Sequence, residues 1–347
     1  AHRTPHSSPT RRSSDLGAAG DSSTINPAAF RAAAQLCATV YVPPGIFRTG
    51  SFNLTSHQRL SLAAGAQLVA LFSVDEVQYP LVLGLPPMGH VSNGFKPRPN
   101  SLITAYGATN VSVVGAGVSS VIDGLGWQWW DVYTWKGAHY SMISLIELSN
   151  CTDVTIAGVT LQNAPTWTLH PFNCDGVHIH DVTVRGPRWA GGVSGIHPDS
   201  SRNVLIEECE VDVGDDAVVV ASYLGFDERP LLAANITVRR CVALSRNLAV
   251  GAGTAGGGRV GTDGQSGETQ RVGSWAERRR PKYCGGLRGW RWVVEGWGGG
   301  GGGGVLVVAV DNAAAVGAST KLFSKAEDMQ ELVRRVLWRC TRLLLSL

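Results

Sequence analysis

The chain has 347 residues, of which 44% are hydrophobic and 16% charged, so it is long enough for one large domain or two ordinary ones. It contains no apolar run long enough to span a bilayer, and its net charge of +3 comes from basic residues gathered mostly near the two ends. These features argue against a membrane span and a dedicated nucleic-acid surface, and 43 glycines favour a turn-rich β architecture over a helix bundle.

The first 18 residues show neither an initiator Met nor an apolar signal segment. They resemble the translation of a sequencing-adapter oligonucleotide, so we expect residues 1–18 to lie outside the native fold. Beyond them, Asn26 and Pro27 predict a short helix from Pro27 to Cys37. Such a helix can cover the open end of a stack of strands. The strands predicted next are residues 40–42, 52–54, 60–62 and 68–69, with a turn at residues 43–45.

From about residue 110 the chain repeats itself. Similar β-branched, alternating segments start at Val111, Val154, Val177, Val204 and Ile236, with offsets of 43, 23, 27 and 32 residues. Strand-only units of this length indicate a solenoid whose coils stack about 4.8 Å apart. A leucine-rich repeat would need regularly placed Leu and Asn, and a sandwich would have less self-similar strands. We therefore predict an all-β fold, a right-handed single-stranded parallel β-helix with a short N-terminal capping helix.

Cysteine and asparagine recur within these units. The seven cysteines contain no CxxC pair and so give no zinc pattern and no readable disulfide framework. We expect the cysteines of the repeats to be buried thiols; they are Cys151, Cys174, Cys209 and Cys241. Four Asn-x-Ser/Thr sequons are candidates either for glycosylation or for turn asparagines at the start of a strand; they are Asn53, Asn110, Asn150 and Asn235.

The pattern stops after about Gly258. Residues 270–280 are charged and aperiodic, and residues 298–304 are all glycine. Residues 305–310 could form one more strand, and residues 325–347 could form an amphipathic helix. Two interpretations stay open for this helix: a partner-binding segment, or non-native coding sequence. The predicted organisation is therefore a non-native segment 1–18, a truncated β-helix domain 19–258, and an unassigned, low-order or non-native tail 259–347.

Two polar patches interrupt the valine-rich strands. One is residues 194–200, and the other is Gly214 followed by Asp215 and Asp216. Paired carboxylates beside a glycine at a strand end suit general acid–base chemistry, although they also occur in plain turns. His178 and His180 alternate on one strand and could suggest a metal pair. With no third ligand nearby in sequence, we expect them on a solvated face and predict no metal site.

Four segments, in order along the chain, resemble glycoside hydrolase family 28, the polygalacturonases and their relatives. They are residues 40–45 (VYVPPG), 121–124 (VIDG), 163–171 (NAPTWTLHP) and 201–207 (SRNVLIE). The resemblance covers about residues 21–258. It implies a right-handed parallel β-helix that hydrolyses α-1,4-galacturonosyl bonds of pectin with inversion and without a cofactor.

Inverting hydrolysis uses one carboxylic acid to protonate the leaving oxygen and a carboxylate to activate water. By resemblance, Asp215 corresponds to the family's acid and Asp216 to one of two water-activating aspartates. The family motif NTDGIDPDS falls on residues 192–200, so the second water-activating Asp is replaced by Ser194, 21 residues before Asp215. A serine hydroxyl cannot serve as a carboxylate base at neutral pH.

Other family positions also differ. The expected Gly-His-Gly falls on residues 245–247, which lack the histidine, and we consider the Arg-x-Lys letters at residues 280–282 a coincidence because Pro281 is unsuited to a strand interior. The resemblance thus implies a polygalacturonase-like enzyme that is possibly inactive in this chain. The alternative is a non-catalytic β-helix that binds acidic cell-wall polysaccharide. A pectate-lyase-like β-helix is disfavoured because no acidic cluster for calcium is visible.

The same resemblance indicates residues near the substrate. Trp167 and His170 fit a strand-end motif beside the cleft, while His197 and Asp199 lie within the cleft motif, so these four are candidate substrate-binding residues. Trp167 could instead be a packed tryptophan at a corner of a coil. The implied partner is pectin or polygalacturonate, the implied state a monomer, and the implied location the extracellular space or cell wall.

Overall fold

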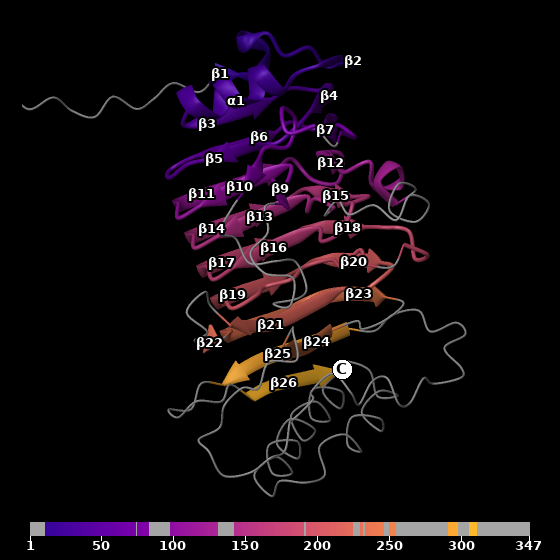
Figure 1. Cartoon of the computed structure of the whole chain (residues 1–347). Coiled ribbons are helices and arrows are strands. Elements are labelled where there is room, and N and C mark those ends of the chain that lie inside the picture. The colour runs from indigo at the N-terminus through magenta and orange to yellow at the C-terminus, as the bar shows by residue number, and fades with distance from the viewer. Residues whose placement is uncertain are drawn as a thin grey trace, which may run out of the picture.

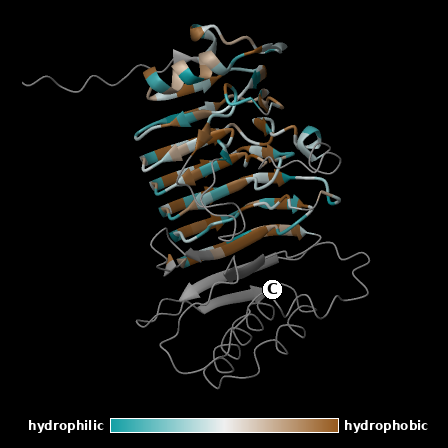
Figure 2. Ribbon diagram, in the orientation of Figure 1, coloured by the Kyte–Doolittle hydropathy of each residue, from teal (hydrophilic) through white to brown (hydrophobic). Residues whose placement is uncertain are grey.

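The structure is a computed structural model that describes residues 11–73, 75–82, 98–130, 142–190, 192–224, 230–231, 233–245, 250–254, 291–297 and 305–310. Short strands stack as successive parallel coils, from the N-terminal elements to β23 and β24 (Figure 1). Figure 2 shows hydrophobic and hydrophilic segments alternating along the stacked strands, as expected where one row of side chains faces a core. The coils present three strand faces.

The first face is a row of parallel strands. Its members are β1 (Arg11–Arg12), β3 (Thr39–Val42), β6 (Arg59–Leu62), β11 (Thr109–Gly115), β14 (Thr152–Ala157), β17 (Asp175–His180), β19 (Arg202–Glu207) and β23 (Ala234–Ser245). The second face is also parallel and ends on the last residues of β23. Its members are β2 (Asp21–Ile25), β4 (Gly45–Thr49), β7 (Ala66–Ala70), β12 (Val121–Asp123), β15 (Thr160–Gln162), β18 (Thr183–Arg185) and β20 (Glu210–Val213).

The third face carries both polar patches. It consists of β5 (Phe52–Leu54), β10 (Ile103–Tyr106), β13 (Ile146–Ser149), β16 (Leu169–Phe172), β21 (Val218–Leu224) and β24 (Val250–Thr254). Between β16 and β21, Ile196 and Asp199 continue the parallel pairing as isolated bridges. Two antiparallel pairs flank the coils, namely β8 (Leu81–Val82) with β9 (Arg98–Pro99), and β22 (Pro230–Leu231) with β21.

The register confirms the predicted repeat. The five predicted segment starts, Val111, Val154, Val177, Val204 and Ile236, are aligned partners on successive strands β11, β14, β17, β19 and β23. All five side chains are buried. The segments are therefore separated by unequal numbers of residues in the sequence but by one coil each in the structure. The longer offsets place additional residues between the strands.

Each of these strands begins with a left-handed corner at its second residue. The residue before each aligned start has a positive φ, and the set is Asn110, Asp153, Gly176, Asn203 and Asn235. Asn, Asp and Gly tolerate this backbone region best. The corner side chains also bond between coils: Asn235 donates to Asn203 (2.7 Å), and Asn203 donates to Asp175 (2.6 Å). Asn150 is likewise left-handed, so the interpretation of the sequons as turn residues fits three of the four positions.

Helix α1 (Pro27–Leu36) contacts η1 (Ser13–Leu16), β3, β4 and β5, and so covers the N-terminal end of the stack, as predicted. It ends one residue earlier than expected, at Leu36. The helix is 10 residues long, and no helix among the described residues is long and apolar enough to cross a membrane. Residues 11–16, which we expected outside the native fold, form β1 and η1, and β1 pairs with β3.

β4 and β25 (Arg291–Trp297) are among the strands that the sequence did not predict. The turn predicted at residues 43–45 ends directly at β4, a strand that was not predicted. In the tail, the predicted strand at residues 305–310 is confirmed as β26 (Val305–Val310), but β25 was not predicted. β25 pairs antiparallel with both β23 and β26, which ends the parallel series. The helix predicted for residues 325–347 lies outside the described residues.

The repeat cysteines are confirmed as buried free thiols. Cys151 lies one residue before β14, and Cys174 lies one residue before β17. The two cysteines occupy equivalent positions on adjacent coils, because the first residues of β14 and β17 pair with each other. The Sγ atoms donate weak hydrogen bonds to backbone carbonyls of neighbouring residues, such as that from Cys174 to the carbonyl of Leu148 (3.4 Å). These thiols therefore act as small apolar fillers at the corners of the coils.

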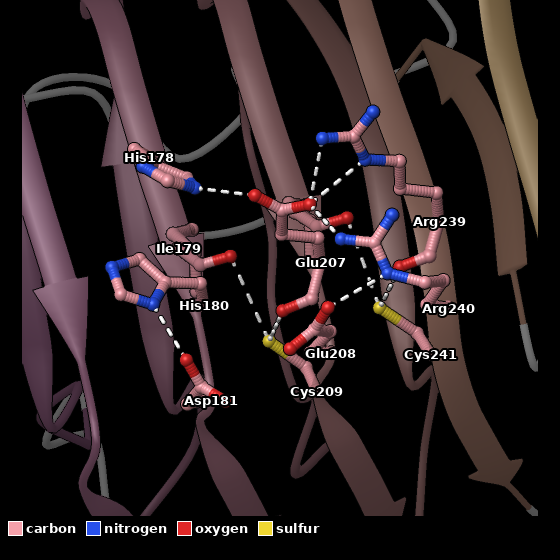
Figure 3. Close-up of polar contacts among 11 residues, drawn as sticks. His178, Ile179, His180, Asp181, Glu207, Glu208, Cys209, Arg239, Arg240 and Cys241 are labelled. Atoms are coloured by element: carbon pink, nitrogen blue, oxygen red, sulfur yellow. Dashed lines mark hydrogen bonds and ion pairs between the residues drawn. The ribbon is translucent and has the colours of Figure 1, made fainter.

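His178 and His180 belong to a charged cluster on the outside of β17, β19 and β23 (Figure 3). Glu207 lies at its centre: it accepts bonds from His178 Nε2 (2.9 Å) and Arg239 Nε (2.8 Å), and it also pairs with Arg240. The histidines are thus partly solvated members of an ion-pair network. Within the described ranges, no group of three or more His, Cys, Asp or Glu side chains is arranged to hold a metal ion.

This network predicts a pH dependence of stability. The hydrogen bond from His178 lowers the pKa of Glu207 from 4.5 to about 2, a shift opposed by desolvation and assisted by Arg239 and Arg240. A carboxylate with a depressed folded-state pKa stabilises the fold above its unfolded-state pKa, and this contribution is lost as the pH falls from about 4.5 to about 2. Urea unfolding at a series of pH values should therefore show a weaker acid-induced loss in Glu207→Gln. Glu208→Gln is the control for removing a neighbouring surface carboxylate. Equal pH profiles of stability for the parent and Glu207→Gln would contradict the depressed pKa of Glu207.

Candidate active site

The two polar patches lie on adjacent coils of the third face. The N–H of Gly195 donates to the carbonyl of Asp216 (2.9 Å), and the N–H of Asp215 donates to the carbonyl of Val193 (3.1 Å). This register places Ser194 directly beside Asp216. The spacing of 21 residues predicted this adjacency. Ser194 is buried, whereas Asp215 and Asp216 are half-buried.

Glycines make this close approach possible. A Cβ atom on Gly214 would lie 2.3 Å from the carbonyl oxygen of Ala190 and 2.7 Å from that of Pro187. A Cβ atom on Gly195 would lie 2.3 Å from the carbonyl oxygen of Ala217. No side chain fits at such distances, so the close packing at Gly214 and at Gly195 requires glycine. The hydroxyl of Ser245 donates to the backbone carbonyl of Asp215 and ties it to the following coil.

The four candidate substrate-binding residues come together beside this pair. The ring of Trp167 lies 4.4 Å from that of His170 and 4.5 Å from that of His197, measured between centroids. His170 Nε2 is 3.4 Å from Asp199 Oδ2, and Ser200 donates to Asp199 Oδ1 (2.7 Å). His170 and His197 are aligned on adjacent coils, because Leu169 bridges Ile196. The cluster is therefore one aromatic and acidic layer, and its role in substrate binding remains a prediction.

Burial sets the charges in this cluster. Burial, together with the nearby His170, holds the pKa of His197 well below its usual range, so His197 is a neutral imidazole. Burial raises the pKa of Asp199, and the hydrogen bond with His170 opposes this shift. Both ring nitrogens of His197 are buried without a hydrogen-bond partner among the described residues. His197 can thus donate or accept a hydrogen bond but is unsuited to act as a cation at neutral pH.

A buried ion pair beneath this layer was not predicted from the sequence. Glu147 is the register partner of His170, is 1% exposed, and pairs with the guanidinium of Arg98. Ser101 Oγ also donates to Glu147 (2.6 Å). Burial raises the pKa of Glu147, but the charges of Arg98 and His170 and the hydrogen bonds outweigh burial, so the pKa lies below its usual value. The sequence signal that could have indicated this pair is Glu147, the single charged residue within the mostly apolar residues 143–148.

Comparisons with known proteins bear on this arrangement. The family model described as "Glycosyl hydrolases family 28" matches residues 89–244, which include both patches and the aromatic layer. These residues are a family 28 segment. The resemblance stated from the sequence is confirmed, and the layer of Trp167, His170 and His197 lies within the segment.

Individual proteins similar to this chain are named polygalacturonases. A protein named "Probable polygalacturonase" from Vitis vinifera is 36% identical over 248 residues, which covers 68% of this chain and 49% of the relative. A protein named "Polygalacturonase" from Juniperus ashei is 32% identical over 124 residues, covering 33% of this chain and 23% of that relative. The chain thus spans about half the length of the first of these proteins, and less of the second.

Solved structures confirm the predicted fold, a right-handed parallel β-helix. A family 28 exopolygalacturonase from Yersinia enterocolitica superposes with a TM-score of 0.59 at 22% identity, covering 71% of this chain and 50% of that one. An exopolygalacturonase from Thermotoga maritima gives a TM-score of 0.56 at 21% identity, covering 73% of this chain and 70% of that one. Both likenesses concern the fold.

Two expected family features cannot be placed in space. The position of the missing histidine falls on residues 245–247, of which only Ser245 is described, and the Arg-x-Lys letters at residues 280–282 also lie outside the described residues. In the described ranges, the candidate site therefore comprises Asp215, Asp216 and Ser194 at the junction of two coils, with the buried aromatic layer next to them.

Proposed function

We propose that this chain is a polygalacturonase-like glycoside hydrolase that cleaves α-1,4-galacturonosyl bonds of pectin by inverting acid–base hydrolysis. The observation that carries the proposal is the placement of Asp215 and Asp216 on the coil adjacent to Ser194, within the family 28 segment. Two carboxyl groups at a coil junction supply an acid and a base without a cofactor. We further propose that the protein acts as a monomer, outside the cell, on cell-wall pectin.

The proposed reaction needs two proton transfers. Asp215 gives its proton to the glycosidic oxygen as the bond from the anomeric carbon breaks, and Asp216 takes a proton from the water that attacks from the opposite face. The product sugar then carries the inverted anomeric configuration. In inverting enzymes the two carboxyl groups lie about 6.5–9.5 Å apart so that this water fits between them.

Ser194 determines how fast the proposed reaction runs. A hydroxyl in place of a carboxylate beside Asp216 removes one of two groups that could orient and deprotonate the water. Groups that act together lose most of their effect when one is missing. We therefore expect slow hydrolysis by this chain. Trp167, His170, His197 and Asp199 are proposed to bind or position the sugar beside this pair.

The test is the release of reducing ends from polygalacturonate, with the anomer of the product followed by NMR. We expect slow release with inversion, and a further loss of about tenfold in Asp215→Asn, smaller than for a complete site because Ser194 already weakens the unit. Glu210→Gln, which removes an exposed carboxylate on β20 of the same coil, is the matched control. Retention of configuration, or equal rates for parent and Asp215→Asn, would contradict the mechanism. Binding without turnover would instead indicate a non-catalytic pectin-binding β-helix.

A further inference from the structure

Trp189 stands out on the surface near the acid pair. The residue is 66% exposed. It belongs to the turn of residues 187–190, which follows β18. About two thirds of the residue is thus open to solvent and available to a ligand.

The ring of Trp189 is held by a second tryptophan. Trp130 meets it edge to face, with ring centroids 5.2 Å apart and planes at 86°. Trp130 is itself buried, and its Nε1 donates to the carbonyl of Pro165 (2.8 Å). One side of Trp189 is therefore supported by a fixed partner. A ring ordered in this way loses little entropy when a ligand stacks on it.

The backbone that carries Trp189 is also fixed. Arg188 forms a two-point ion pair with Asp212, with Nε–Oδ1 at 2.9 Å and Nη2–Oδ2 at 3.3 Å. The N–H of Ala190 closes the turn on the carbonyl of Pro187 (3.0 Å). The turn lies against Gly214, because a Cβ atom on Gly214 would overlap the carbonyl of Ala190. Trp189 is thus one position from a residue that touches Gly214, and Gly214 directly precedes Asp215.

We infer that Trp189, supported by Trp130, is a stacking platform for one sugar ring of a polysaccharide bound across the acid pair. A flat indole offers a rigid apolar face with little side-chain entropy to lose, and a pyranose ring offers a matching C–H face. The occupant is identified by continuity with the site: the turn of residues 187–190 packs against Gly214, which directly precedes Asp215, so a chain of sugars bound at Asp215 lies close to Trp189. That the polysaccharide is pectic rests on the proposed function.

The test measures binding of oligogalacturonates of two to eight units by calorimetry, in an Asp215→Asn host that limits turnover. Adding Trp189→Ala should weaken the Kd about three- to tenfold for the longer oligomers and leave the shortest unchanged, as expected for the loss of one aromatic contact. Trp189→Phe should stay within about twofold of the host. Val118→Ala removes another exposed apolar side chain, on the turn between β11 and β12, and should have no effect. Thermal unfolding of each variant verifies that the fold is intact.

The outcomes separate this inference from the proposed hydrolysis. Length-dependent weakening in Trp189→Ala without any hydrolysis by the parent would support the platform and overturn the hydrolase. Hydrolysis with identical binding by the host and Trp189→Ala at every length would overturn the platform and leave the hydrolase standing. If the folded host binds no oligogalacturonate, the pectic platform is overturned, and hydrolysis by the parent then decides the enzyme.

Discussion

Replacing Ser194 with aspartate is expected to raise the turnover of polygalacturonate by at least about tenfold. The new carboxylate would lie beside Asp216, where Gly195 and Asp216 already hold the two coils together, so no backbone change is needed. A positioned general base contributes about 10²–10⁴-fold in rate. We allow for a gain below this range because residues 245–247 lack the histidine that the family resemblance implies.

The matched control is Ser194→Asn, which has nearly the size of aspartate but cannot accept a proton. Initial rates of reducing-end release should rise in Ser194→Asp and not in Ser194→Asn. In the Ser194→Asp background, Asp215→Asn should cost more than it does in the parent, because members of one catalytic unit are not additive. If Ser194→Asp and Ser194→Asn have equal rates, the position takes no part in activating water, and the proposed assignment of residues 192–200 fails.

The fold was largely predictable because its signals are local and repeated. Val177 and Val204 could be aligned from the sequence alone, and the structure pairs them as neighbours on β17 and β19. The same reasoning missed β4 and β25. β4 begins at Gly45, a turn residue by type, and its pairing with β7 is a contact between coils that no local pattern encodes. β25 pairs antiparallel with β23, outside the repeat.

The candidate site was predictable where a motif carried it. Asp215 and Ser194 were expected on adjacent coils, and the register places them there. The Arg98–Glu147 pair was missed because its members are 49 residues apart, and Arg98 precedes the repeats that made the register readable. The platform residue Trp189 was missed because a lone tryptophan gives no indication of its exposure. Only the structure shows that Trp130 supports it.

The second large effect is expected at the buried ion pair. Replacing Arg98 with methionine should lower the free energy of unfolding at pH 7 by about 3–5 kcal/mol, because it leaves the charge of Glu147 buried without its partner. The matched control is Arg202→Met, which removes an exposed pair with Asp175 at 3.9 Å and should cost less than about 1 kcal/mol. The double variant Arg98→Met, Glu147→Leu should recover much of the loss, because an apolar pair of similar volume needs no compensation.

The pH dependence identifies the cause of this loss. In the parent, the folded-state pKa of Glu147 lies below its usual value, so its contribution is present at neutral pH and is lost as the pH falls. Without Arg98, burial should dominate and raise the pKa of Glu147. Glu147 would then take up a proton on folding, so the variant would gain stability relative to the parent as the pH falls. Urea unfolding at pH 7 and at pH 5 should therefore show a smaller difference between parent and Arg98→Met at the lower pH. A difference independent of pH would mean that Arg98 stabilises the fold by packing of its side chain and not by its charge.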